Sequence, residues 1–525
     1  MAYRLQEKEG GAEMLPPQTA DKVLAIGGDF CYYVGMLKPT EKQTQLEFVS
    51  IEELVPVGHL LRKIDKAIDF GFIRDKVAGL YCADNGRPAI DPVVLFKMLF
   101  VGYLFGVRSE RQLARDVEVN VAYRWFLGLG LREKVPDAST LSQNRRRRFS
   151  ESTVYQEIFD EIVFQAAGRG LVDGRVLYTD STHLKASANK KKFIKEDVQK
   201  STCTYFDELE RDINIDRAEH GKRPLKAEPN EPVVKETKIS TTDPESGYMV
   251  REGKPEGFFY LDHRTVDGKN NIITDSHVTP ASVHDSVPYL ERLDRQRERF
   301  GFKVEAVGLD AGYYTAAICK GIEDRDIYGV IGYRRPTHRK GYFYKKDYVY
   351  DEGLDCYRCP GGQTLRYSTT NRDGYREYKS DPKQCRSCEH IGKCTQSANH
   401  VKVVTRHVWE DSKKRVDEHR LTGVGKQIYK RRKETVERSF ADSKQLHGHR
   451  YARMRGLKKA LEQALLCAAV QNMKKIALVM AGRTEKGLST VINRLLGLLR
   501  TIRNSVFASP SGRRVYGYNT IQQAL

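Results

Sequence analysis

The sequence predicts an α/β protein in which a helical region precedes a mixed sheet of five strands. Between residues 54 and 152, apolar side chains recur at intervals of three or four, which is the period of a helix. From residue 175 onward, short β-prone runs replace that pattern, and each run ends in polar or turn-forming residues. Five of the ten cysteines lie between Cys356 and Cys394, which predicts a separate small unit there.

The helical region contains a strongly apolar helix over residues 93–103. Pro92 suits the first turn of that helix, and Ser109 is expected to cap the next one. Shorter helices are expected over 111–127 and 139–149. They form either a helix-turn-helix-like DNA-binding unit or a plain helical bundle, and the pattern favours neither.

Runs of β-prone residues with alternating polarity predict the five strands. The strands are expected at residues 175–182, 257–266, 271–278, 303–309 and 326–332. Asp267-Gly268 predicts a tight turn between the second and third strands. The polar stretch 190–255 is expected to be an insertion or flexible loop, apart from a helix over 198–213. A long helical stretch over 429–444 and then 457–480 follows.

Positive charge is in large excess. The chain has 89 Lys and Arg against 69 Asp and Glu, a net charge of +20 and a pI near 9.3. This excess favours a polyanionic partner, and nucleic acid is the commonest one. It is clustered at residues 145–148, 190–192 and 430–433, and in a mixed basic and aromatic stretch at 334–346. A single run is more often a solvated face, but four runs near candidate catalytic residues indicate DNA binding. The residues expected to contact DNA here are Arg145, Arg146, Arg147, Arg148, Lys430, Arg431, Arg432 and Lys433.

The start of the chain, residues 1–21, has early acidic residues and no apolar stretch, so a secretory signal is not expected. The most apolar stretch, 93–107, carries Lys97 in its interior and is too short to span a bilayer. We therefore expect a cytoplasmic protein that associates with the nucleoid when bound to DNA and has no membrane partner. In that reducing compartment, cysteines are expected to be thiols or metal ligands.

Acidic residues end two of the predicted strands, Asp180 the first and Asp310 the fourth. Strand ends in an α/β sheet bring together residues that are far apart in sequence. A third acid is expected from the helix over 429–444, where Glu437 lies beside an apolar face. Glu434, one turn earlier, is the alternative.

Three convergent carboxylates predict phosphodiester chemistry. Two divalent ions about 3.5–4 Å apart assist in-line displacement by stabilising the attacking and leaving oxygens. Mg²⁺ and Mn²⁺ prefer oxygen ligands, so two such ions are expected on Asp180, Asp310 and Glu437. Five strands followed by helices, with acids at strand ends, further indicate a ribonuclease H-like core.

Four blocks of sequence carry a resemblance to a known family. They are LYTDSTHLKASA at 177–188, VTPASVHDS at 278–286, GLDAGYYT at 308–315 and RRKETVERSFADSK at 431–444. In this order they resemble the signature blocks of bacterial insertion-sequence transposases with a DDE catalytic domain. The stretch GRPAIDPVVLFKMLF at 86–100 resembles the N-terminal domain of the same group. The resemblance implies a ribonuclease H-like core with Asp180, Asp310 and Glu437 as its metal-binding triad.

Many members of that group carry a Tyr-Arg-Glu-Lys pattern around the glutamate. Lys444, seven residues after the glutamate, matches its lysine, and the resemblance implies contact with a terminal phosphate. An ordinary surface lysine is the alternative. The positions of the pattern's Tyr and Arg hold Lys430 and Lys433 instead, while Tyr429 and Arg432 stand one residue early. The Tyr and Arg roles therefore stay open.

Two CxxC pairs and a fifth cysteine lie between the second and third acids. In chain order they are Cys356, Cys359, Cys385, Cys388 and Cys394. Two such pairs present four thiolates in the tetrahedral arrangement that zinc prefers, which predicts a structural Zn²⁺ in a zinc-ribbon-like insertion. Cys394 or His390 is a substitute for one ligand. Five unligated thiols are the alternative.

These inferences predict a DNA transposase whose helical domain binds the terminal inverted repeats of a mobile element. The core then cleaves the DNA ends, and the freed 3′-hydroxyls attack target DNA, so both DNAs are expected partners. Because two ends are handled together, a homodimer or larger synaptic complex is expected. Two alternatives stay open: a catalytically silent DNA-binding relative, and a structure-selective nuclease on the same core.

The expected domains follow the chain in six segments. They are an extension over 1–50, a helical DNA-binding domain over 51–155, the first part of the core over 170–345 with the insertion 190–255, a cysteine-rich insertion over 346–425, the last part of the core over 426–485 and a basic tail over 486–525. His183, His284 and Asp285 lie close to the catalytic blocks and are candidates for auxiliary roles.

Overall fold

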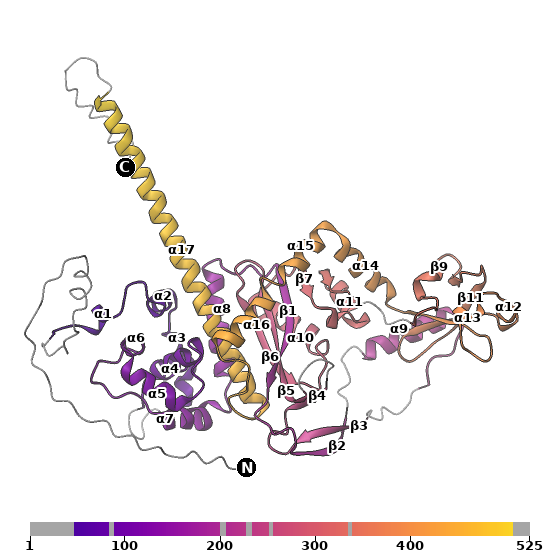
Figure 1. Cartoon of the computed structure of the whole chain (residues 1–525), viewed down its shortest axis with the longest axis horizontal. Helices are drawn as coiled ribbons and strands as arrows, with labels where there is room; N and C mark the ends of the chain where they lie inside the picture. The colour runs from indigo at the N-terminus through magenta and orange to yellow at the C-terminus, as the bar shows by residue number, and fades with distance from the viewer. Residues whose placement is uncertain are drawn as a thin grey trace, which may run out of the picture. The chain divides into compact units, whose positions relative to one another are not determined.

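A computed structural model of the chain describes residues 47–82, 89–199, 206–226, 234–250, 256–333 and 339–507. One compact unit, Ile51–Leu525, carries all of the helices and strands that follow (Figure 1). The basic residues Arg334, Arg335 and His338 lie outside the described residues, as do most of the segment 1–50 and the end of the basic tail.

The first part of this unit is helical, as predicted. Its α-helices are α1 (Ile51–Leu54), α2 (Leu60–Ala67), α3 (Phe72–Val77), α4 (Pro92–Leu104), α5 (Glu110–Val119), α6 (Val121–Leu127), α7 (Ala138–Asn144) and α8 (Val154–Gly168). α4 begins as expected, because the Asp91 carboxylate accepts a hydrogen bond from the Val93 N–H and Pro92 occupies the first turn. The Ser109 hydroxyl caps α5 in the same way. The four-arginine run continues α7 as a π-helical turn, Arg145–Phe149.

The central sheet is mixed and contains all five predicted strands. They are β1 (Val176–Lys185), β5 (Gly257–Asp267), β6 (Ile273–Pro280), β7 (Ala306–Leu309) and β8 (Tyr328–Ile331). β6, β5 and β1 are antiparallel neighbours, whereas β1, β7 and β8 run parallel. A short sixth strand, β4 (Gly247–Met249), pairs with the start of β5. The prediction of an α/β protein with a mixed sheet and a helical N-terminal region is confirmed.

Helices cover both faces of this sheet. On one face α10 (Tyr289–Phe300) is fixed by Arg292, whose Nε donates to the Asp275 carboxylate of β6 at 2.7 Å. α11 (Ala316–Glu323) lies on the same face, where Ile322 packs close to Gly329 of β8. The opposite face is covered by α15 (Gly423–Arg431), which packs on β7 and β8, and by α16 (Val436–Leu446), which packs on β1 and β5.

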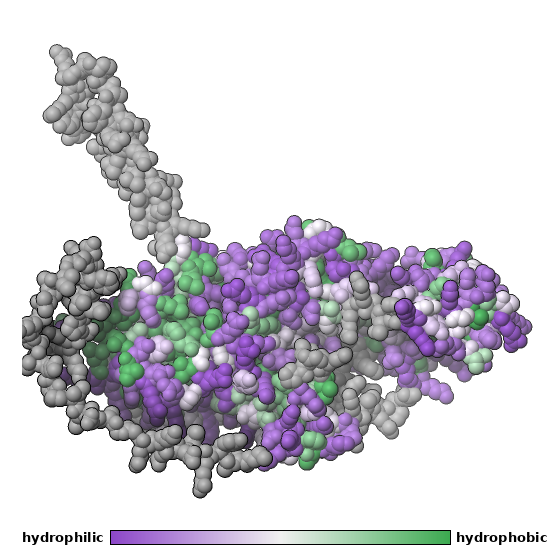
Figure 2. Space-filling view, viewed as in Figure 1, coloured by the Kyte–Doolittle hydropathy of each residue, from purple (hydrophilic) through white to green (hydrophobic). Residues whose placement is uncertain are grey.

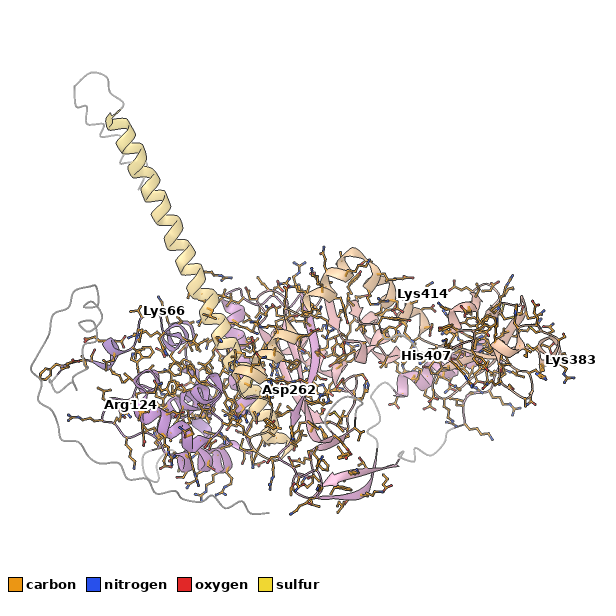
Figure 3. The ribbon with its side chains drawn as sticks, viewed as in Figure 1. Lys66, Arg124, Asp262, Lys383, His407 and Lys414 are labelled. Atoms are coloured by element: carbon orange, nitrogen blue, oxygen red, sulfur yellow. The ribbon has the colours of Figure 1, made fainter. Side chains whose placement is uncertain are left out.

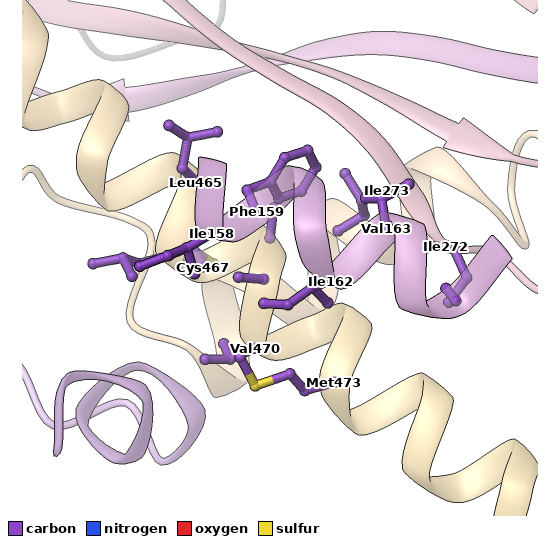
Figure 4. Packing of buried hydrophobic residues seen from close by; sticks show 14 of the residues in the cluster. Ile158, Phe159, Ile162, Val163, Ile272, Ile273, Leu465, Cys467, Val470 and Met473 are labelled. Carbon is purple, nitrogen blue, oxygen red and sulfur yellow. The ribbon is translucent and has the colours of Figure 1, made fainter. Parts of the chain in front are cut away.

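The apolar core continues from the sheet into the helical region through α8 and α17 (Leu457–Phe507). Ile158, Phe159 and Ile162 of α8 pack with Leu465, Val470 and Met473 of α17 beside Ile273 of β6 (Figure 4). The segment Leu457–Arg483 of α17 is long and apolar enough to cross a membrane, but 67% of its most apolar window is buried inside the protein. This pattern is the one expected of a core helix.

A second sheet, antiparallel throughout, follows the central one. Its strands are β9 (Val349–Asp351), β10 (Cys356–Arg358), β11 (Thr364–Thr370), β12 (Tyr375–Lys379) and β13 (Val403–His407), paired in the order β13-β12-β11-β10-β9. Tyr348, Tyr357, Leu365, Tyr378 and Val404 form its small core. Short helices α12 (Pro382–Arg386) and α13 (Ile391–Cys394) lie between β12 and β13, and hydrophilic side chains cover most of the visible surface here (Figure 2). We call this sheet with α12 and α13 the second-sheet module.

The polar stretch 190–255 is more ordered than predicted. Residues 193–199 form β2 (Phe193–Gln199), which pairs with β3 (Val234–Ser240) over seven residues, and α9 (Phe206–Glu219) begins later than the predicted helix. The prediction of a helix from residue 198 is wrong, because a partner strand more than thirty residues away fixes that segment as a strand.

α9 packs against the second-sheet module, although about 130 residues separate the two in sequence. The Arg217 guanidinium donates to the Thr370 carbonyl at 2.7 Å, and the Trp409 indole N–H donates to Asp212 at 2.6 Å. Asp216, buried, accepts from Arg376 of β12 at 2.5 Å. Figure 1 shows the magenta α9 beside the orange strands of this module. The two predicted insertions therefore contact each other as one assembly.

The predicted helix over 429–444 is interrupted. α15 ends at Arg431, residues 432–435 form a turn, and α16 begins at Val436. The buried Thr435 hydroxyl bonds back to the Arg431 carbonyl at 3.0 Å, which competes with a continuous helix. Glu434 therefore lies exposed in the turn, and the prediction that it lies one turn before Glu437 on a continuous helix is wrong.

Candidate active site

The central sheet places Asp180 and Asp310 next to each other. The prediction that the first strand ends at Asp180 is wrong. β1 continues to Lys185, because β5 pairs with it from Leu177 to Lys185. The parallel ladder between β1 and β7 ends at the pair Thr179 and Leu309, and the two acids are the next residues on each strand. Neighbouring strands lie about 4.8 Å apart, so both carboxylates reach the same small volume.

Arg432 lies at the centre of all three predicted acids. Its Nη2 is 2.8 Å from Asp180 Oδ2, and its Nη1 is 3.5 Å from Asp310 Oδ1 and 3.7 Å from Glu437 Oε1. The Arg432 side chain is only 4% exposed, whereas those of Asp310 and Glu437 are 51% and 45% exposed. One buried guanidinium thus faces a largely buried carboxylate, Asp180, and two carboxylates that open toward solvent.

The turn between α15 and α16 explains how Arg432 reaches this position. The Glu437 N–H donates to the Arg432 carbonyl at 3.2 Å, a bond over five residues instead of the four of an α-helix. One extra residue is thereby accommodated between Arg432 and Glu437, while the spacing of Tyr429 to Arg432 stays intact. This extra residue accounts for the one-residue offset of Tyr429 and Arg432 in the sequence, and the Arg432 guanidinium lies 5.5 Å from the Tyr429 ring.

The electrostatics single out Asp180. Burial raises the pKa of Asp180 to about 6, and the neighbouring Asp310 and Asp285 act in the same direction, although Arg432 and the Ser181 N–H oppose them. A carboxyl group whose pKa is raised among other acids is a frequent mark of a functional site.

Two further polar groups border the acids. The Lys444 ammonium donates to the Thr182 hydroxyl, two residues beyond Asp180 on the same face of β1. Asp285 accepts a hydrogen bond from the Ser181 hydroxyl at 2.8 Å. The structure therefore places Lys444 and the auxiliary candidate Asp285 beside the triad, on opposite faces of β1.

A second carboxylate–arginine pair, which the sequence did not point out, lies buried on the same face of the sheet. Asp262 of β5 accepts from Arg264 at 2.7 Å, from His449 at 3.0 Å and from Ser276 at 3.1 Å. Asp262, labelled in Figure 3, has no exposed surface. The Arg264 guanidinium continues to the hydroxyls of Ser439 at 3.0 Å and Ser443 at 2.7 Å. It thereby fastens α16, which carries Glu437, to the sheet.

The eight residues of the two basic runs predicted to contact DNA, 145–148 and 430–433, differ in exposure. Arg145 is buried and paired with Glu110 and Glu462, and Arg432 is buried among the acids. Arg148 is partly buried, with its guanidinium 4.3 Å from the Tyr81 ring. The remaining five are exposed, namely Arg146, Arg147, Lys430, Arg431 and Lys433. These five alone present their charge to solvent as a DNA-binding surface requires.

Four of the five clustered cysteines line one small cavity in the second-sheet module. They are Cys359, Cys385, Cys388 and Cys394, with His390 beside them. A Cβ built on Gly361 would lie 3.4 Å from the Cys388 sulfur and 3.8 Å from the Cys359 sulfur, so these two thiols face the same space. Cys356 is buried in β10 and is not among the residues that line this cavity. Cys394, rather than the predicted Cys356, is therefore the fourth cysteine at this cavity.

The three carboxylates lie close to one another, and so do the four thiols, but neither group is arranged as a complete metal site. Within the described ranges, no three His, Cys, Asp or Glu side chains stand close enough to hold a metal ion. At the triad, Arg432 lies between the carboxylates.

Two family models match the chain. The one described as a transposase domain (DUF772) matches residues 49–147, and the one described as a transposase DDE domain matches residues 358–477. No curated protein matches. A solved structure, the piggyBac transposase synaptic complex with hairpin DNA, is 10% identical and covers 81% of this chain and 76% of that one. Its TM-score of 0.31 is too low to support an inference.

The two matched models cover the helical region and the segment that carries the third acid, and both describe transposase domains. The chain is therefore a DNA transposase. It carries a transposase domain (DUF772) followed by a transposase DDE domain, in the order that the sequence blocks indicated.

Proposed function

We propose that this transposase cleaves and joins DNA with divalent ions held by Asp180, Asp310 and Glu437. The observation that carries the proposal is the convergence of the three carboxylates on the single buried guanidinium of Arg432. A cation already stands among them, and three carboxylates form the hard oxygen donor set that Mg²⁺ or Mn²⁺ prefers. Two bound ions would supply an activated nucleophile and stabilise the leaving oxygen.

The protein's own groups hold this site ready. Arg432 offsets the repulsion among three acids that face one another. Lys444, on the rim beside Thr182, is placed to bind a phosphate at the DNA end as a point charge. Water and then a 3′-hydroxyl serve as nucleophiles, so a covalent protein–DNA intermediate is not required.

The core is ribonuclease H-like in this proposal. The strand order supports it: three antiparallel strands, β6-β5-β1, are followed by β7 and β8 parallel to β1, with acids on the two central strands. This order explains why residues 130 positions apart in sequence meet at one point.

The helical domain over 51–155 would bind the terminal inverted repeats, with target DNA as the second substrate, in the cytoplasm where both are found. Two element ends must be joined to one target, so a homodimer or larger synaptic complex is part of the proposal. The exposed Arg146, Arg147, Lys430, Arg431 and Lys433 support DNA binding by their charge.

The proposed zinc is structural and is held by Cys359, Cys385, Cys388 and Cys394 in the second-sheet module. Four thiols around one cavity are a donor set that zinc prefers, and His390 is the substitute ligand. Closing the site would tie α12 and α13 to β10 and β11. The pairing of two CxxC motifs in the sequence favours Cys356 in place of Cys394. Zinc content of Cys356→Ser and Cys394→Ser distinguishes these two ligand sets.

The alternatives to a transposase reaction are a catalytically silent DNA-binding protein and a structure-selective nuclease. A catalytically silent DNA-binding protein would not need three acids gathered around a cation. A structure-selective nuclease would use the same acids but would cut without reference to terminal repeats and without strand transfer.

The test is cleavage of end-labelled DNA carrying the element's own flanking sequences, in Mg²⁺ or Mn²⁺. Cutting at the element ends with joining to a second DNA supports the transposase reaction. Tight binding without cutting in either metal would support the silent protein, and cutting at junctions regardless of the repeats would support the nuclease.

A further inference from the structure

A cleft lies where the helical region meets the segment between α16 and α17. Its volume is about 550 Å³. One wall comes from α4, α5 and the loop between them, a second from α7, and a third from Arg453 and Met454. Three segments far apart in sequence therefore form a single concave surface.

The charges in this cleft are mostly uncompensated. Arg108, Arg111 and Arg453 line it, and none of the three forms an ion pair with a carboxylate in the described part of the chain. Arg453 is held in place by its guanidinium lying 3.8 Å from the Tyr103 ring. Arg145 also lines the cleft, but it is buried and paired with Glu110 and Glu462. The three arginines without a carboxylate partner therefore create a site for an anion.

An exposed aromatic ring adjoins the cleft. Tyr451 is 46% exposed, and its ring centroid lies 5.2 Å from the Arg108 guanidinium and 5.7 Å from the Lys185 ammonium. Its backbone is tied to the end of β1, because the Lys185 N–H donates to the Arg450 carbonyl and the Ala452 N–H donates to the Lys185 carbonyl. A fixed, solvent-facing ring with cations close by is the arrangement on which nucleic acid bases stack.

The position of Tyr451 relates it to the catalytic acids. Lys185 is five residues beyond Asp180 on β1, which corresponds to roughly 16 Å along the strand. At about 3.4 Å per nucleotide of B-form DNA, that distance spans about five nucleotides.

We propose that the cleft binds the DNA backbone about five nucleotides from the cut, with a phosphate on Arg108, Arg111 and Arg453 and a base stacked on Tyr451. The proposal rests on the proposed function, since it assigns the place where the cleaved DNA lies. Base stacking on a tyrosine is largely sequence-tolerant, so the site would hold the strand in register without reading its sequence.

The base contact is tested with 2-aminopurine, a base whose fluorescence is quenched by stacking. The probe is moved one position at a time along a single-stranded tail of the end DNA, because bases inside a duplex are already quenched by their neighbours, and the full chain is added to each DNA. Quenching should peak near position five in the wild type, persist in Tyr451→Phe and disappear in Tyr451→Ala. Equal quenching at every position, or quenching that survives Tyr451→Ala, would overturn the proposal.

The phosphate contact is tested by the salt dependence of binding to the same DNA. Arg111→Ala should reduce the slope of log affinity against log salt by about one. Arg115→Ala is the matched control, because Arg115 is exposed one turn further along α5 and does not line the cleft. Equal effects of the two substitutions would contradict the proposal.

The two proposals fail in different ways. If the wild type cleaves and joins element ends while Arg111→Ala and Tyr451→Ala match it in binding, the cleft is not the DNA site and the proposed function stands. If the wild type binds no end DNA at all, the proposed function fails and this inference falls with it.

Discussion

Two carboxylate–arginine pairs lie on the same face of the central sheet, Asp180 with Arg432 and Asp262 with Arg264, and their charges are satisfied to different degrees. Asp262 receives three donors, and Arg264 binds further hydroxyls on α16. Asp180 receives a single side-chain donor, and three acids share that guanidinium.

The pKa values move in opposite directions for this reason. Burial disfavours ionisation of both acids. At Asp262 the Arg264 charge and the bonds from His449 and Ser276 outweigh burial and hold the pKa below its ordinary value. At Asp180 burial wins and raises the pKa to about 6. A fully satisfied buried charge serves the fold, whereas an under-satisfied one marks the place where a further cation is expected.

The largest expected effect is on the chemistry. Asp180→Asn, Asp310→Asn and Glu437→Gln should each reduce DNA cleavage at least about a thousandfold, because each removes an ionised ligand of the proposed metal site. The measurement is cleavage and strand transfer of end-labelled element DNA in Mg²⁺ and in Mn²⁺.

Glu434→Gln is the matched control for the third acid, since Glu434 lies exposed in the turn before α16. Its cleavage rate should stay close to that of the wild type. Cleavage that survives Glu437→Gln but not Glu434→Gln would show that the third acid is misassigned.

For the free energy of unfolding, we expect Asp262→Asn to have a larger effect than Asp180→Asn. Asp262→Asn should lower the free energy of unfolding by about 3–5 kcal/mol, because Arg264 would be left buried without a carboxylate. Asp180→Asn should not lower it at neutral pH, since the neutral amide avoids the cost of a buried ionised carboxylate and Arg432 keeps Asp310 and Glu437. Denaturant unfolding of both variants without metal measures the difference, and equal losses would refute the distinction between the two pairs.

Much of this contrast could be predicted from the sequence, but the arginines could not. Asp180 and Asp310 follow β-prone runs, and parallel pairing of those runs is enough to bring the acids together. The position of Arg432 depends on the turn at 432–435, which the helical pattern of residues 429–444 does not reveal. Arg264 lies in the strand β5, and the sequence pattern of a strand does not reveal which distant residues an arginine in it will bind.

Long-range pairing set the other limit. β2 forms because β3 lies opposite it. α9 is held by two hydrogen bonds to residues more than a hundred positions later: Arg217 donates to the Thr370 carbonyl, and the Trp409 indole donates to Asp212. The CxxC spacing of the sequence favours Cys356 over Cys394 as the fourth ligand. The fold instead brings Cys394 of α13 to the cavity and leaves Cys356 in β10.

The cysteine cavity extends the comparison to a second group of under-satisfied ligands. Cys394→Ser should lose bound zinc and destabilise the second-sheet module, because the cavity would keep only three thiolates. Cys356→Ser should retain zinc, since Cys356 does not line the cavity. Metal content of the purified variants, measured by atomic emission, decides between the two ligand sets, and zinc lost in Cys356→Ser alone would favour the set predicted from the sequence.

The smallest expected effect is the dependence on pH, and its sign differs at the two acids. The folded pKa of Asp180 is about 6, above the ordinary value of 3.8, so the folded state holds a proton that the unfolded state has released. Its contribution to stability is therefore present below about pH 4 and is lost as the pH rises through 6.

For Asp262 the folded pKa is below 3.8, so its contribution is present above that value and is lost in acid. The metal must displace the proton of Asp180, so the Mn²⁺ concentration for half-maximal cleavage should rise up to about tenfold for each pH unit below 6 and stay flat above 7. Titrating Mn²⁺ at several pH values tests this dependence. A midpoint that does not move between pH 5 and 7 would mean that Asp180 is already ionised before the metal binds.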